Sequence, residues 1–129
     1  MQIEEIRNIA VAALEDIKAR DIAVLDVKKL TSLFDYLIVA SGESARQTKA
    51  LARNVHDKVK AAGGVVLGVE GEQSGEWVLV DLGGVVVHVM QPAVRDYYRL
   101  EQLWGGELPR RVTPLRRPEW ATQRGQARP

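Results

Sequence analysis

The chain has 129 residues, of which 46% are hydrophobic and 27% are charged, proportions that fit one folded globular domain and not a disordered segment. It contains no cysteine, which excludes disulfides, thiolate metal sites and a thiol nucleophile. The net charge of +1 hides an asymmetry, since residues 108–129 carry +5 and residues 1–107 carry −4.

This division of charge predicts a folded domain over residues 1–107 and a flexible, proline-containing basic tail over residues 108–129. From its total charge alone, the acidic body is expected to bind nucleic acid poorly by itself, because such binding depends largely on neutralising phosphates. The tail arginines either contact RNA or serve only as a solubilising extension. No signal-like start or membrane-length apolar run is visible, so we expect a cytoplasmic protein.

The first half of the chain predicts two helices and two strands. Apolar residues recur at helical spacing over residues 3–19, and two β-branched runs follow at residues 22–27 and 35–40. Ser44 with Gln47 three residues later has the pattern of a capping box, which opens a second helix that ends at Gly63-Gly64.

An extended segment at residues 65–70 is followed by the clearest local signal, a hairpin of residues 77–82 and 85–90 around the loop Gly83-Gly84. In this register one side of the hairpin is purely aliphatic, and we expect that side to lie on the helices. Its facing pairs are Leu82 with Val85, Val80 with Val87, and Val78 with Val89.

The other side of the hairpin mixes apolar and polar residues. Trp77 faces Met90, Leu79 faces His88, and Asp81 faces Val86. This side is too apolar for open solvent and too polar for a sealed core, which favours a docking surface with an aromatic anchor. The alternative is that another helix or a second copy of the chain covers it.

Pro92 at a first helical position begins a third helix, which we expect to run to Gly105-Gly106. Val94, Tyr97, Leu100 and Trp104 mark its apolar side. The complete order is helix, two strands, helix, three strands and helix, which predicts an α/β fold with a mixed sheet of about five strands and helices packed on it.

Candidates for catalysis are few. The turn at residues 41–44 lacks a phosphate-binding lysine and repeated glycines, so a helix cap is the favoured interpretation. Asp81 has Leu79 and Gly83 as its neighbours on the same face, so the carboxylate pair that would hold magnesium in a nucleotidyl transferase is missing. Neither His56 nor His88 is accompanied by other residues in a metal-binding pattern. We therefore expect a protein that is not an enzyme, with no cofactor and no metal.

Several segments closely resemble the ribosomal silencing factors, also called the Iojap family. The resemblance spans about residues 3–105, and the order and spacing of its motifs make it specific. The segments that carry it are residues 35–47, 67–71, 77–83, 86–90 and 97–104.

The resemblance implies a nucleotidyltransferase-like fold without the transferase residues, and a homodimer when free. It further implies binding to ribosomal protein L-fourteen of the large subunit, which would sterically block the small subunit and repress translation when nutrients are scarce. The partner-binding residues that it implies are Glu70, Gly71, Trp77, Leu79, Asp81, Leu82, His88, Tyr97 and Tyr98.

The chain departs from the family pattern at Gly84, where the family usually has aspartate after the hairpin glycine. The tail also lies outside the common pattern, so its role is not inherited from the resemblance. Two other functions stay open: a divergent metal-dependent nucleotidyl-transfer enzyme, and an RNA-binding module that uses the basic tail.

Overall fold

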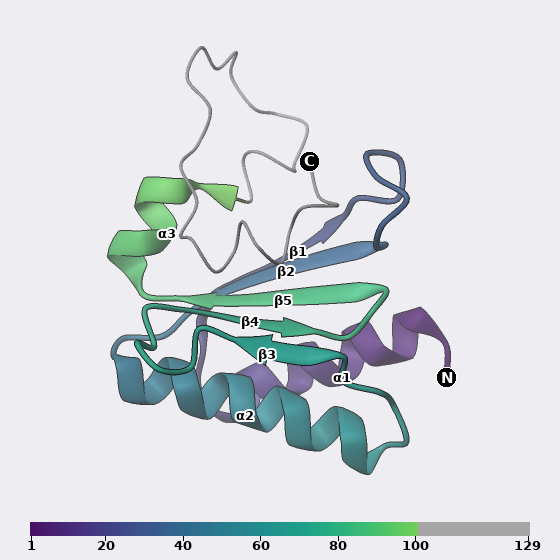
Figure 1. Ribbon diagram of the computed structural model, residues 1–129, viewed down its shortest axis with the longest axis horizontal. Coiled ribbons are helices and arrows are strands. Elements are labelled where there is room, and N and C mark those ends of the chain that lie inside the picture. The colour runs from purple at the N-terminus through teal and green to yellow at the C-terminus, as the bar shows by residue number, and fades with distance from the viewer. Residues whose placement is uncertain (101–129) are drawn as a thin grey trace.

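The computed structural model describes residues 1–100, which form one five-stranded sheet between two layers of helix (Figure 1). Two helices cover one side of the sheet, and the third lies on the other side. In chain order the elements are α1 (Ile3–Asp16), β1 (Arg20–Asp26), β2 (Tyr36–Ser41), α2 (Ala45–Ala61), β3 (Gly68–Glu70), β4 (Trp77–Asp81), β5 (Val85–Met90) and α3 (Pro92–Tyr98).

The sheet is mixed, with strand order β1-β2-β5-β4-β3. Strands β2 and β5 run parallel, and the other three pairs are antiparallel. The parallel pair requires a long connection, which α2, β3 and β4 provide. The expected α/β fold with a mixed sheet of five strands is therefore confirmed.

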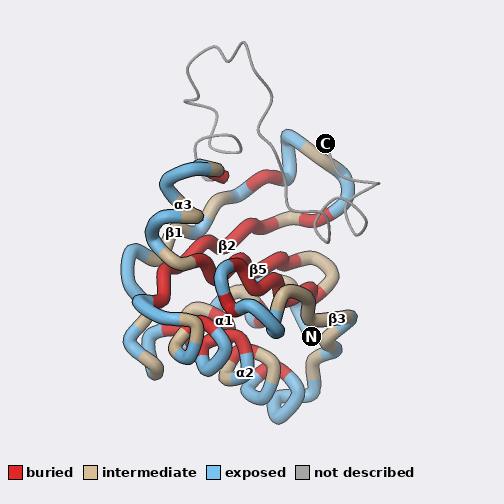
Figure 2. Tube along the Cα trace, turned by 60° about the vertical axis from the view of Figure 1, so that its left-hand side comes forward, coloured by how far each residue is buried: buried red, intermediate tan, exposed pale blue. Residues whose placement is uncertain are grey.

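Both sides of the sheet are buried, so the molecule has two hydrophobic clusters. Every residue of β2, β4 and β5 is buried, because these three strands are covered on both faces (Figure 2). The helix cluster lies between the sheet and helices α1 and α2, and it contains the aliphatic side of the hairpin, as predicted. The tryptophan cluster, defined by Val27, Phe34, Leu37, Val39, Trp77, Leu79, Val86, Met90 and Leu100, lies on the opposite face.

Helix α1 is shorter than the sequence predicts. It ends at Asp16 because Lys18 adopts a left-handed conformation, with φ of 64°. The Ala19 amide then donates to the Leu14 carbonyl and the Lys18 amide to the Glu15 carbonyl, a hydrogen-bond pattern that satisfies the last carbonyls of the helix. The chain is thereby free to enter β1 at Arg20, two residues before the predicted start.

The third predicted helix is broken within its expected range. Helix α3 ends at Tyr98, and Arg99 follows in the left-handed region with φ of 51°. The predicted continuation to Gly105-Gly106, including Trp104, lies outside the described residues. Strand β3 likewise covers only Gly68–Glu70 of the predicted segment 65–70, although the Leu67 amide still donates to the Asp81 carbonyl.

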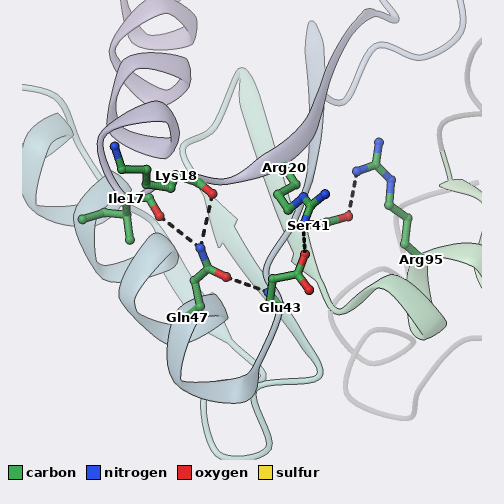
Figure 3. A network of polar contacts seen from close by, with 7 residues as sticks. All are labelled: Ile17, Lys18, Arg20, Ser41, Glu43, Gln47 and Arg95. Carbon is green, nitrogen blue, oxygen red and sulfur yellow. Dashed lines mark hydrogen bonds and ion pairs between the residues drawn. The ribbon is translucent and has the colours of Figure 1, made fainter.

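The start of α2 is fixed by the predicted pair Ser44 and Gln47. The Ser44 hydroxyl accepts from the Gln47 amide at 3.1 Å, and the Gln47 side-chain oxygen accepts from the Glu43 amide at 2.7 Å. The same glutamine donates to the carbonyls of Ile17 and Lys18 (Figure 3). One side chain therefore joins the start of α2 to the end of α1.

Within residues 1–100 no helix is long and apolar enough to cross a membrane.

Candidate functional site

The hairpin β4–β5 positions most of the predicted site residues, and its register is as predicted. Trp77 pairs with Met90, Leu79 with His88, and Asp81 with Val86. On the next strand Glu70 pairs with Leu79. The side chains of Glu70, Leu79 and His88 therefore form one row across three strands on the face that carries Trp77.

This face is not open, so the prediction of an uncovered docking surface is wrong. Trp77 is 3% exposed, Leu79 1% and His88 6%. Val94 and Tyr98 of α3 pack against the tryptophan cluster, and Leu100 lies within it. The mixed composition instead makes a second core, which is the alternative in which a helix covers this side.

Two polar side-chain groups of this face, those of Trp77 and His88, are paired with each other. The indole Nε1 of Trp77 donates to His88 Nδ1 at 2.8 Å, and the two ring centroids lie 5.8 Å apart. A buried donor or acceptor without a partner is costly, and this bond satisfies both groups. It also requires that His88 Nδ1 carries no proton, because that nitrogen accepts.

Two tyrosines extend the aromatic cluster from Trp77 to the surface. The ring centroids of Tyr98 and Trp77 lie 4.8 Å apart, and those of Tyr97 and Tyr98 lie 4.9 Å apart, with the second pair in an edge-to-face arrangement. Tyr97 is 64% exposed, whereas Tyr98 is half-buried. The aromatic stack of Trp77, Tyr98 and Tyr97 thus connects the buried indole to solvent.

Helix α3 is held over the face by polar contacts that the sequence did not reveal. The guanidinium of Arg95 donates to the hydroxyl of Ser41, at the end of β2, over 2.9 Å (Figure 3). The Gln91 side chain, just before the helix, donates to the Gly75 carbonyl at 3.2 Å. A buried serine at a strand end and an arginine one turn into a short helix give no pattern that would have predicted this contact.

The remaining predicted residues take different positions. Asp81 is 9% exposed, and its carboxylate accepts from the Gly83 amide at 2.9 Å, which helps to close the hairpin turn. Leu82 lies on the opposite face, in the helix cluster, so it does not share a surface with Trp77. Glu70 and Gly71, on edge strand β3 and just after it, are half-buried. Of the nine predicted residues, solvent therefore reaches mainly Glu70, Gly71, Tyr97 and Tyr98.

The chemistry available in the site is that of packing and hydrogen bonding. Among residues 1–100, no three histidine, aspartate or glutamate side chains are grouped so that they could hold a metal ion. Across the sheet Asp81 pairs with Val86 on one side and Gly68 on the other, so neither facing residue supplies a second carboxylate.

The fold and the site define a small α/β protein with a single mixed sheet, in which an aromatic stack leads from a buried hairpin to the surface. The chain belongs to the ribosomal silencing factor family. Residues 1–128 match the family described as "ribosomal silencing factor during starvation". The resemblance noted from the sequence motifs is therefore confirmed.

Individual relatives agree with this assignment. A ribosomal silencing factor of Chromobacterium violaceum is 62% identical over 109 residues, which cover 84% of this chain and 89% of that protein. A crystal structure of a C. violaceum protein superposes with a TM-score of 0.81 at 58% identity, covering 92% of this chain and 98% of the other. A Mus musculus protein named "mitochondrial assembly of ribosomal large subunit protein 1" is 32% identical over 100 residues, which cover 75% of this chain and 44% of that protein.

Proposed function

We propose that this protein docks on the large ribosomal subunit through ribosomal protein L-fourteen and sterically prevents the small subunit from joining, which represses translation when nutrients are scarce. Membership of the silencing-factor family supports this role, and so does the relative named for assembly of the large subunit. Such a role is carried out in the cytoplasm and needs no catalytic step.

The observation that carries the proposal is the aromatic stack. Tyr97 is the one aromatic side chain among residues 1–100 that is largely exposed, and it rests on Tyr98, which rests on Trp77. A rigid exposed aromatic side chain is a typical anchor of a protein interface. The half-buried carboxylate of Glu70 lies on the same face and would complement a basic ribosomal protein.

The anchor therefore shifts from Trp77, which the sequence favours, to Tyr97. Because Trp77 is buried, Trp77→Ala would weaken folding as well as docking, and the two effects would be hard to separate. Tyr97 does not have this problem, because its side chain is mostly in solvent. We also propose that the free protein forms the homodimer implied by the resemblance.

Sedimentation with purified large subunits tests the proposal. Tyr97→Ala is expected to weaken the affinity for large subunits, measured by co-sedimentation over a range of concentrations, by at least about tenfold, which corresponds to about 1.4 kcal/mol or more. Val65→Ala is the matched control, because Val65 is 65% exposed and lies outside the stack. Equal co-sedimentation of wild type, Tyr97→Ala and Val65→Ala would contradict the role of the stack. Failure of the wild type to hold large and small subunits apart would contradict the function itself.

We further propose that the sheet and its helices are a nucleotidyltransferase-like fold that has lost transfer chemistry. The Asp81 carboxylate is engaged by the Gly83 amide, and its facing residues Val86 and Gly68 are not acidic. Calorimetry with nucleotide and magnesium is expected to show no heat of binding. Magnesium-dependent binding that disappears in Asp81→Ala would instead establish a divergent nucleotidyl-transfer enzyme.

A further inference from the structure

Helix α2 carries a row of basic side chains along its outer side. Its members are Arg46, Lys49, Arg53, His56 and Lys60, which recur every three or four residues. At about 100° per residue they fall within roughly 80° of the helix circumference, and at about 1.5 Å per residue they extend over roughly 21 Å. The four lysines and arginines are exposed, and His56 is half-buried. We call these five residues the basic stripe.

The positive charges of the stripe are not neutralised within the part of the chain that the structure describes. The ion pairs there include Arg20 with Glu43, Lys28 with Asp26, and Lys58 with Asp16, and the His56 ring forms a hydrogen bond with Asp57. None of them involves an arginine or lysine of the stripe. Two carboxylates border it, those of Asp57, which pairs with His56, and Glu72.

Such an arrangement is unfavourable for the helix itself. Like charges three or four residues apart repel, and Arg46, Lys49 and Arg53 follow one another at these intervals. A helix face that only had to be soluble would alternate acids with bases, as exposed helices often do. The uncompensated row therefore indicates a partner that supplies the negative charge.

The surroundings of the stripe identify the kind of partner. No exposed large hydrophobic residue among those described belongs to α2, so the stripe lacks the apolar side that would enter a membrane and the anchor that would fix a folded protein. A straight row of cations matches a chain of phosphates, whose binding needs positive charge alone. The geometry points to the basic stripe of α2 as a binding surface for the phosphate backbone of RNA.

This surface is separate from the aromatic stack. Helix α2 lies under the sheet on the side away from α3, so a molecule on the stripe leaves Tyr97 accessible (Figure 1). Midway along the stripe a pocket of about 240 Å³ opens between α2 and β3, lined by Arg53, His56, Ala52, Val69 and Glu72. The Glu72 carboxylate would repel a phosphate there, so removing its charge should strengthen the binding of RNA, whereas removing charges of the stripe should weaken it.

Binding of a fluorescent single-stranded oligouridylate to the full chain, followed by anisotropy over a range of salt concentrations, tests the inference. Replacing Lys49, Arg53 and Lys60 by glutamine is expected to weaken binding and to reduce the slope of log K against log salt by about 2, at roughly 0.7 per phosphate contact. The matched control replaces Lys18, Lys29 and Lys58 by glutamine, which removes the same charge from exposed positions outside the stripe. The control should keep the wild-type slope, and Glu72→Gln should tighten binding.

Equal slopes for the two triple variants would overturn the inference, because binding would then follow net charge or the tail. It would also be overturned if polyglutamate or vesicles containing phosphatidylserine bound the stripe as tightly as the RNA. Loss of folding does not confuse the result, since relief of repulsion along α2 should leave the melting temperature of the stripe variant equal to or above that of wild type. Subunit sedimentation through Tyr97 is a separate measurement, so this inference and the proposed function can fail independently.

Discussion

The hydrogen bond between Trp77 and His88 supports a quantitative prediction about the tryptophan cluster. The two groups are 2.8 Å apart and almost fully buried. A buried hydrogen bond contributes about 0.5–1.5 kcal/mol, and a buried group left without its partner costs about 1–3 kcal/mol. Trp77→Phe removes the donor and keeps an aromatic ring, so the free energy of unfolding should fall by about 2 kcal/mol. His88→Leu removes the acceptor and should have an effect of similar size.

The double variant separates the bond from general loss of packing. Once both partners are gone, neither is left without its partner, so the double variant should be about 1–2 kcal/mol more stable than the sum of the single losses implies. Urea unfolding followed by circular dichroism measures all four proteins. As a control, Trp77→Phe combined with Val59→Ala should be additive, because Val59 belongs to the helix cluster on the other face. Additivity of the Trp77 and His88 variants within about 0.5 kcal/mol would refute the coupling.

Three further predictions concern the scaffold. Gly75→Ala should lower the free energy of unfolding, measured by thermal melting, by about 2–5 kcal/mol, because its φ is 74° and a β-carbon there would lie 2.8 Å from that of Ala45. Gly63→Ala is the control: its φ is 96° but a β-carbon there would meet open space, so the loss should be only about 1–2 kcal/mol. Gln47→Ala should cost about 1–2 kcal/mol in urea unfolding, since its side chain joins both helices. Hydrogen exchange should be faster for the amides of α3 than for those of β5, because α3 buries none of its residues.

The hairpin could be predicted in full from the sequence, because its signals are local. Two glycines fix the loop, and the loop then fixes every pair from Trp77–Met90 to Asp81–Val86. The aliphatic side was assigned to the helices correctly for the same reason, since side chains alternate along each strand. Both the turn type and the alternation of side chains can be predicted from the residues of the hairpin alone.

The ends of α1 and α3 could not be predicted, because the residues that end them carry no signal. Left-handed positions at helix ends usually hold glycine, but here they hold Lys18 and Arg99. The Lys18 conformation is stabilised by distant contacts, including the hydrogen bond from Gln47 to its carbonyl. Tertiary contacts of this kind are not visible in a local pattern, so the apolar spacing alone extended the first predicted helix too far and gave no sign of the break in the third helix at Arg99.

The second face of the hairpin was misread because an interface and a small core favour the same residues. An indole beside a histidine fits either role, and the choice depends on whether α3 folds back over it. The contacts that hold α3 there join distant parts of the chain, as Arg95 and Ser41 do, which are 54 positions apart. Under the docking proposal, a partner that approaches this face meets Tyr97 first and Tyr98 next. Trp77 then acts from beneath, by holding the Tyr98 ring in place, and its contribution to binding should be lost whenever Tyr98 is removed.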